Sequence, residues 1–256
     1  MKHIKKKFLF QKEITKDEMR ELDLASTIIE HNSVKVIDQG IVPFLVTDKS
    51  IFIQSFIYSE NGSQYYIPEP DQVLIYFNNA QANFKIIKEK KSILLKSLNP
   101  KEIVTEDLMN QIYGLFGITS GFVIFMFSSL EAFINQLIPE DFIYVKEIKN
   151  KRTERYSKDQ IQRWIQFDEK LNMIIVQVTN KNFQKKYPLK AQHINNLKEF
   201  RNELIHPKHN PGINKYHYLS KRALKFKYEE TIKAVKDFMN YLKPKYIEEC
   251  DCGADH

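Results

Sequence analysis

Three residues that could act together on a phosphate lie in the stretch FRNELIHP, residues 200–207: Arg201, Asn202 and His206. Asn202 and His206 are four residues apart, so a helix places them on one face, with Arg201 beside that face. Pro207 disfavours the helical conformation at His206, which places the imidazole at the C-terminal edge of the helix. The stretch therefore predicts a fixed cation next to a ring that can exchange protons near neutral pH.

These groups suit the cleavage of RNA without a metal ion. That reaction needs a proton donor or acceptor near neutral pH and a cation for the charge that develops on phosphorus. The ribose 2′-hydroxyl supplies the nucleophile, and only RNA carries one. The same residues also fit a structural role, in which Arg201 pairs with a surface acid such as Glu199 or Glu203 and His206 caps a helix. Spacing alone does not separate the two interpretations.

The stretch resembles the signature of the HEPN superfamily, in which an arginine, usually followed by a polar residue, precedes a histidine by four to six residues. Here Arg201 is followed by Asn202 and, after a gap of four residues, by His206. The earlier segment SSLEAFINQLI resembles the long first helix of that family, and the resemblance covers about residues 105–245. It implies a metal-independent endoribonuclease, of a kind frequent in bacterial toxins and antiphage defence, that acts as a homodimer and leaves a 2′,3′-cyclic phosphate.

The resemblance also implies a role for each residue. Arg201 would bind the scissile phosphate and stabilise its transition state, His206 would transfer a proton, and Asn202 would orient the phosphate or the ring. A toxin subgroup that a nucleotidyltransferase partner silences carries a tyrosine two residues after the histidine, where this chain has Lys208. Glu131 is a candidate for orienting Arg201 or His206, and it also fits an ordinary surface position. A catalytically idle module that binds RNA or nucleotides, or mediates dimerisation, is the alternative function.

Positive charge is concentrated in residues 141–245, which hold 24 lysines and arginines against 11 acids. This excess fits a surface that binds a polyanion such as RNA, and it equally fits a solvated lysine-rich surface. Within it, residues 145–158 combine cations that neutralise phosphates with a tyrosine that can stack on a base. A plain charged loop between helices is the alternative there. The predicted RNA-contact residues are Lys149, Lys151, Arg152, Arg155, Tyr156 and Lys208.

The sequence predicts no cofactor and no catalytic metal. The glycines of GLFGITSG lack the Lys-Ser/Thr ending of a phosphate-binding loop. His209 lies near His206 without acids or thiols at ligand spacing. Cys250, Cys252 and His256 could hold a metal, but the stretch ECDCGADH that carries them, at the end of the acidic tail 246–256, is expected to be disordered. Two cysteines give no disulfide framework, which indicates a reducing, cytoplasmic location.

The elements before residue 98 predict a small antiparallel β-rich region with a regulatory or sensing role. A helix is expected at 16–30, and Asn61-Gly62 is the strongest hairpin signal. The runs predicted as strands are rich in Ile, Val, Phe and Tyr: VKVI, IVPFLV, SIFIQSFIY, QYYI and VLIYF.

After Pro100 the apolar period becomes helical, and Thr105 is the expected N-cap of the first helix. Residues 99–245 therefore predict an all-α, HEPN-like bundle of four to five helices, which makes the chain α+β overall. The predicted helices are 105–139, with a kink near Gly117–Gly121, and 158–178, 189–206 and 227–242.

Residues 108–130 carry no charge and are long enough to span a bilayer. They include Asn, Gln, Thr and Ser and continue into an amphipathic, charged segment, which favours a buried core helix. A membrane-associated protein is the alternative. The sequence as a whole predicts a cytoplasmic homodimer that acts on RNA, with an antitoxin or other regulatory partner and no membrane contact.

Overall fold

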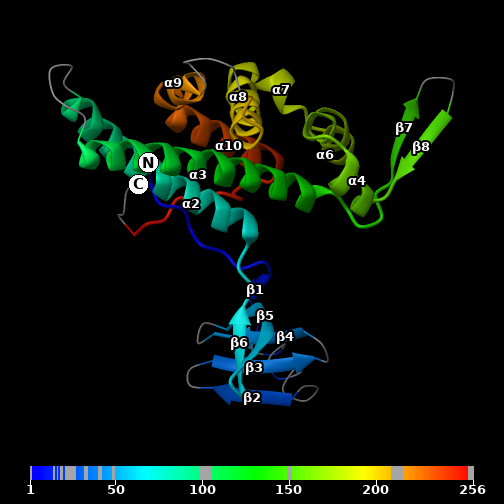
Figure 1. The fold of residues 1–256 in the computed structure, drawn as a ribbon. Helices are drawn as coiled ribbons and strands as arrows, with labels where there is room; N and C mark the ends of the chain where they lie inside the picture. Colours follow the sequence, from blue (N-terminus) through cyan, green and yellow to red (C-terminus); the bar gives the residue numbers. More distant parts are fainter. Residues whose placement is uncertain are drawn as a thin grey trace. The chain divides into compact units, whose positions relative to one another are not determined.

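The computed structural model shows a mixed α/β protein that is mostly helical, with small antiparallel sheets. Its contacts divide the chain into two units, residues 6–75 and residues 1–5 together with 76–256 (Figure 1). We call them the strand unit and the helical unit. The structure describes residues 2–13, 15, 17, 20, 27–31, 34–39, 42–47, 50–98, 105–148, 152–208 and 216–252.

The strand unit is an antiparallel sheet in the order β1-β5-β4-β3-β2, with β6 paired to the second half of β5. Its strands are β1 (Gln11–Glu13), β2 (Thr27–His31), β3 (Val34–Gln39), β4 (Val42–Val46), β5 (Ile51–Glu60) and β6 (Ser63–Pro68). The first four predicted runs are confirmed as β3 to β6. The hairpin signal is also confirmed, because Asn61 and Gly62 both adopt positive φ angles, 51° and 79°, between the paired Glu60 and Ser63.

One prediction in this part of the chain is wrong, and a second is wrong in part: Asp17 and Arg20 are helical, as the helix expected at 16–30 requires. The run VLIYF, expected as a strand, begins helix α2 (Gln72–Ser97). The aromatic residues of α2 pack against rings distant in sequence, since Tyr76 stacks on Phe125 and Phe84 stacks on Tyr228. The end of the helix expected at 16–30 is instead strand β2, and most of the remainder lies outside the described residues. Because α2 from residue 76 onward belongs to the helical unit, the observed division falls inside the region predicted as 1–98.

The helical unit is built along α3 (Glu106–Leu137). Thr105 caps this helix as expected, accepting a hydrogen bond from the Leu108 backbone N–H at 3.2 Å, and the helix runs without interruption past its glycines. The elements that follow are β7 (Tyr144–Ile148), β8 (Arg152–Tyr156), α4 (Lys158–Trp164), α5 (Phe167–Glu169), the π-helix η1 (Lys170–Ile174), α6 (Ile175–Thr179), α7 (Phe183–Lys186), α8 (Pro188–Ile205), α9 (His217–Lys225) and α10 (Tyr228–Leu242).

The predicted helices at 189–206 and 227–242 are confirmed as α8 and α10, which pack with α3 around a shared apolar core (Figure 1). Phe133 of α3 and Phe238 of α10 meet edge to face at a centroid distance of 6.1 Å. The helix expected at 158–178 is interrupted, because Ile165 is extended at ψ 130° and a π-helical turn follows. The segment 145–158, for which a plain interhelical loop was one interpretation, instead forms the β7–β8 hairpin.

Helix α3 is the one helix of the described residues whose length and composition would allow it to cross a membrane. The core helix of a soluble protein meets the same criterion, so the finding does not separate the two predicted alternatives. Its buried residues are Leu115, Thr119, Phe122, Val123, Met126, Phe127, Ser129, Leu130, Phe133 and Ile134.

The start of the stretch ECDCGADH pairs with another segment, since Glu249 forms an antiparallel β-bridge with Ile4, which corrects the expectation of disorder there. The residues just before it are packed. Tyr246 and Ile247 are 6% and 2% exposed. The Tyr246 hydroxyl hydrogen-bonds the side chain of Gln136 on α3 at 3.1 Å. The side chain of Asn240 holds Ile247 on both sides, donating to its carbonyl at 2.9 Å and accepting from its N–H at 2.8 Å. These contacts fix the acidic tail against α3 and α10.

Candidate active site on helix α8

Helix α8 carries the Arg/Asn/His stretch and is held in place by its buried face. Pro188 occupies its first turn, where a missing N–H costs nothing, and the helix ends at Ile205. Its buried residues recur at helical spacing: Ala191, Ile194, Leu197 and Phe200. Arg201 follows directly after the last of them, so its side chain starts at the boundary between the core and the surface.

The Arg201 guanidinium lies over the ring of Phe127 on α3, with its Cζ 5.1 Å from the ring centroid. Such a position is attractive because the ring face is electron-rich. Nη1 of Arg201 also donates a hydrogen bond to Oδ1 of Asn202 at 3.1 Å. Two neighbours, one on α3 and one on α8, therefore define where this cation sits. Neither neighbour carries a charge.

The acids that the structural alternative assigned to Arg201 belong to another arginine. Arg222 of α9 donates to Glu203 at 2.6 Å and lies 3.6 Å from the carboxylate of Glu199. It also donates to the main-chain carbonyl of Asn196 at 3.0 Å. Within the part of the chain that the structure describes, Arg201 has no ion-pair partner, so pairing with Glu199 or Glu203 is wrong. Its charge is not neutralised by a carboxylate.

His206 is the C-cap of α8, with φ −122° and ψ 64°, as its position before Pro207 led us to expect. The cap uses the backbone, since the His206 N–H donates to the Asn202 carbonyl at 2.9 Å. The side chain is exposed, and its ring makes no hydrogen bond or ion pair with any residue in the described ranges. Asn202 is thus the link between the two other residues, through its side chain to Arg201 and through its carbonyl to His206.

Glu131 of α3 was considered as a partner of Arg201 or His206, but its charge acts on Lys170. Lys170 is 1% exposed and donates to the carbonyl of Gln162 at 2.9 Å and to Asn135 at 3.3 Å. Burial lowers the pKa of Lys170, and the charge of Glu131 partly offsets that effect. No hydrogen bond joins Glu131 to Arg201 or His206 among the described side chains. The charge of Glu131 acts on a buried lysine.

Among the residues predicted to contact RNA, those that the structure describes do not form one cluster. The β7–β8 hairpin lies at the end of α3 opposite to α9 (Figure 1). On it, Arg155 is exposed, whereas Tyr156 stacks on Tyr144 at a centroid distance of 6.4 Å and donates its hydroxyl to Glu154. Lys208 is exposed just after α8, where its N–H donates to the Tyr218 hydroxyl at 3.2 Å. Lys149, Lys151, the side chain of Arg152, His209 and His256 lie outside the described residues.

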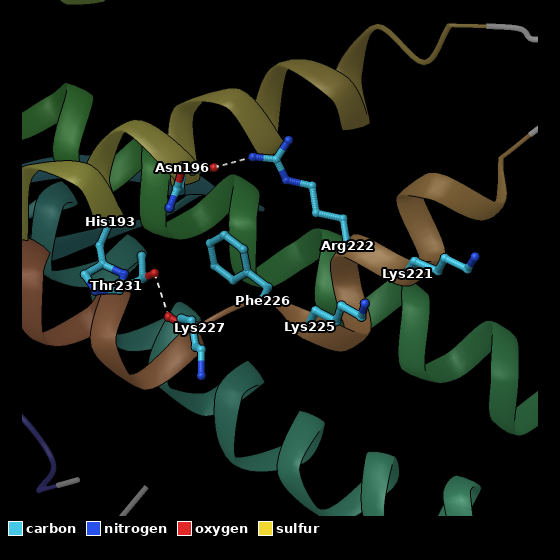
Figure 2. A pocket seen from close by; sticks show the side chains of 8 residues that line it. All are labelled: His193, Asn196, Lys221, Arg222, Lys225, Phe226, Lys227 and Thr231. Atoms are coloured by element: carbon cyan, nitrogen blue, oxygen red, sulfur yellow. Dashed lines mark hydrogen bonds between the residues drawn. The ribbon is translucent and has the colours of Figure 1, made fainter. Parts of the chain in front are cut away.

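A basic cavity of about 360 Å³ between α8, α9 and α10 was not anticipated (Figure 2). His193 lines it from α8, and Arg222 crosses toward Asn196 on the same helix. The cations around it come from one short segment, KRALKFK. They are Lys221, Arg222, Lys225 and Lys227. The density of four cations in seven residues is the sequence feature that could have predicted this basic site. Such a lining favours an anionic ligand.

A second cavity, of about 540 Å³, lies between the first half of α3, α9 and the end of α8. Leu204, within the Arg/His stretch, contributes to its wall, and the facing residues include Phe116 and Tyr216. None of the described side chains that line it is charged. It therefore suits an apolar or aromatic group, such as a nucleobase or the side chain of a partner.

Comparison with known proteins gives no information on the role of the Arg/His stretch. No family model, no curated protein and no solved structure matches this chain. The resemblance to the HEPN superfamily therefore rests on the spacing of Arg201, Asn202 and His206 and on the helical context of α3 and α8.

Proposed function

We propose that this chain is a metal-independent endoribonuclease of the HEPN type, with Arg201, Asn202 and His206 as its catalytic residues. The observation that carries the proposal is the environment of Arg201. Its guanidinium is positioned by an aromatic ring and an amide, while the nearby acids are bound to Arg222. A positioned cation without a counter-charge is what a phosphate-binding site requires.

Arg201 would bind the scissile phosphate. A guanidinium has five N–H donors, and one hydrogen bond, to Asn202, occupies part of that set. The planar group can offer two parallel donors to phosphate oxygens while Phe127 supports one of its faces. Because a guanidinium can only donate, Asn202 must turn its Oδ1 toward Arg201. The Asn202 amide nitrogen is then a donor that can orient a second phosphate oxygen.

His206 would transfer the proton. Its ring is exposed and takes no part in the cap of α8, so it can turn toward a bound ribose. One imidazole removes the proton from the 2′-hydroxyl, and the 2′-oxygen attacks phosphorus. The bond from phosphorus to the 5′-oxygen breaks, and an imidazolium protonates that leaving oxygen. The products are a 2′,3′-cyclic phosphate and a 5′-hydroxyl. The reaction therefore suits a site with two imidazoles, one that accepts the first proton and one that donates the second.

A homodimer would supply the second imidazole. Helix α3 exposes apolar side chains from its uncharged segment: Met109 is 46% exposed, Tyr113 81% and Ile124 40%. A second copy of the chain could cover part of this surface and bring two α8 ends to one cleft. A role as a toxin or antiphage effector in the cytoplasm, controlled by an antitoxin or other regulatory partner, follows from the resemblance.

The test is cleavage of RNA by the purified protein in excess EDTA. We expect cleavage to persist, and the upstream product to carry a 2′,3′-cyclic phosphate. The same RNA with a 2′-O-methyl group at the cut site, and DNA of the same sequence, should stay intact because neither has the nucleophile. Cleavage that needs added magnesium or manganese, or that proceeds equally on the methylated RNA, would contradict the mechanism.

A second candidate function is supported by the basic cavity of Figure 2. Three of its four cations lie on α9 and none of them depends on His206, so an idle module could bind a nucleotide or an RNA phosphate there. RNA binding without cleavage by a folded, dimeric protein, abolished by Lys221→Ala combined with Lys225→Ala, would favour this candidate over the ribonuclease.

A further inference from the structure

The first and last segments of the helical unit pair with each other. Ile4 and Glu249 form an antiparallel β-bridge, and Ile4 is 2% exposed. The Lys5 N–H donates to the Glu248 carbonyl at 2.8 Å, and the Cys250 N–H donates to the His3 carbonyl at 2.6 Å. Figure 1 shows the first described segment, in blue, passing beside the last, in red. This pairing sets the distance between side chains that lie at opposite ends of the sequence.

The pairing brings together one imidazole and two thiols. A ring nitrogen of His3 and the sulfur atoms of Cys250 and Cys252 all lie within 4.8 Å of one another. Nδ1 of His3 is 3.7 Å from Sγ of Cys252. In a tetrahedral zinc site the metal is about 2.1 Å from nitrogen and 2.3 Å from sulfur, which puts the ligand atoms roughly 3.5–3.8 Å apart. Small side-chain rotations would bring all three atoms within reach of one ion.

The backbone that carries these ligands is anchored to the helical unit. On the C-terminal segment, Lys236 of α10 pairs with Glu249 at 2.7 Å, and Asn240 holds Ile247. On the N-terminal segment, the side-chain amide of Gln81 on α2 donates to the carbonyl of Lys2 at 3.3 Å. Both halves of the cluster are therefore positioned by contacts other than the ligands themselves, as a metal site requires.

We propose that His3, Cys250 and Cys252 bind one zinc ion, which joins the two ends of the helical unit. Two thiolates with an imidazole select zinc over magnesium or calcium, which take oxygen ligands. Water can complete the tetrahedron as the fourth ligand. The role is structural and separate from the chemistry at α8. Sequence spacing drew attention to the two cysteines but not to His3, because the third ligand comes from the opposite end of the chain.

The test uses the full-length chain, purified under reducing conditions and stripped with a chelator, and then titrated with cobalt(II) as a spectroscopic probe. We expect one cobalt per chain, a thiolate-to-cobalt charge-transfer band, ligand-field bands of tetrahedral cobalt, and displacement by zinc. Zinc should also raise the melting temperature. Cobalt that binds without a charge-transfer band, or zinc that leaves the melting temperature unchanged, would overturn the proposal.

Three variants, His3→Gln, Cys250→Ser and Cys252→Ser, should each weaken zinc binding by at least tenfold, roughly the lower limit known for groups that only orient a ligand. His217→Gln is the matched control, because His217 is an exposed histidine at the start of α9. A variant that misfolds gives no affinity, so alkylation of the wild type supplies a second readout. Zinc should slow modification of both cysteines. Equal rates with and without zinc, or a His3→Gln affinity equal to that of His217→Gln, would contradict the site.

Discussion

Two arginines in the helical unit stack on phenylalanines at nearly the same distance but have opposite surroundings. Arg201 lies 5.1 Å from the ring of Phe127, and Arg222 lies 5.2 Å from the ring of Phe200. Arg222 donates to Glu203 and to a main-chain carbonyl, with Glu199 nearby, whereas Arg201 donates to an amide. An arginine whose donors are taken by acids joins two helices. One whose donors are mostly available keeps its charge for a ligand. The difference separates an arginine on α9 that joins two helices from an arginine on α8 that we propose binds a ligand.

A large effect on catalysis is expected when Arg201, the arginine proposed to bind the ligand, is removed. Arg201→Ala should lower the single-turnover rate of RNA cleavage by roughly 10²–10³-fold, the loss typical of one transition-state donor. Arg201→Lys should recover little, because an ammonium lacks the two parallel donors. The free energy of unfolding should change by less than about 1 kcal/mol, the value of an exposed cation–π contact. If Arg201→Ala destabilises the fold as much as Arg222→Ala and still cuts RNA, the contrast between the two arginines is lost.

Arg222→Ala should show the reverse pattern. Glu203 would keep a partly buried carboxylate without its cation, and we expect a loss of about 2 kcal/mol in the free energy of unfolding in urea. Lys221→Ala is the matched control, since Lys221 is an exposed cation next to Arg222 on α9, and it should change stability by less than about 0.5 kcal/mol. The folded fraction of Arg222→Ala should retain most cleavage. Unchanged stability would show that the acids do not need Arg222.

A titratable side chain in the core, Tyr228, also has a structural role. Burial raises the pKa of Tyr228 from 10.0 to about 12, and its hydroxyl donates to the Ala223 carbonyl at 2.6 Å. Because the folded pKa lies above the unfolded one, this stabilisation is complete below about pH 10 and is lost as the pH rises toward about 12. The slope is about 1.4 kcal/mol per pH unit. Tyr144, whose pKa burial and Glu169 also raise to about 12, adds to the same loss.

Tyr228→Phe should therefore be less stable than the wild type at pH 8 by about 1 kcal/mol, because it lacks the hydrogen bond. Between pH 10 and pH 12 the two stability curves should converge and then cross, because a loss of about 1.4 kcal/mol per pH unit in the wild type exceeds the initial difference of about 1 kcal/mol. Urea unfolding across this range measures both effects, and Tyr113→Phe, at an exposed position of α3, is the control. Parallel curves for the wild type and Tyr228→Phe would refute the assignment.

The smallest effect concerns RNA affinity. Lys221→Ala or Lys225→Ala, at the basic cavity, should weaken RNA binding a few-fold and lower the slope of log affinity against log salt by about 1. Lys198→Ala is the control on α8, because Asp168 already holds the Lys198 amine at 2.6 Å. The single-turnover rate at saturating RNA should not change. A Lys198→Ala effect equal to that of Lys221→Ala would show that the cavity has no special role in binding.

The features predictable from sequence were those encoded locally. Thr105 caps α3 with its own side chain, and Asn61-Gly62 adopts the positive φ angles that such a turn needs. The run at the start of α2 was misassigned because it is short and rich in β-formers, and the rings that bury this helix come from α3 and α10. Contacts with residues distant in sequence therefore determine that this run is helical.

The candidate site likewise has features that were predictable from the sequence and features that depend on contacts between distant segments. Spacing identified Arg201, Asn202 and His206, and Pro207 indicated where the helix ends. Which arginine takes Glu199 and Glu203 could not be read from the sequence, since the acids lie beside Arg201 in the chain and beside Arg222 in space. The pairing depends on how α9 packs on α8. The approach of His3 to Cys252 depends likewise on pairing between distant segments.

The most direct test of the central claim, that the α8 stretch performs chemistry rather than supports the fold, is the single-turnover cleavage rate of His206→Ala in EDTA. The His206 ring makes no contact that the described fold relies on, so unfolding and RNA affinity should match the wild type. Loss of positioned proton transfer should slow cleavage by roughly 10²–10⁴-fold. A folded His206→Ala protein that cuts the same RNA at the wild-type rate would contradict the claim.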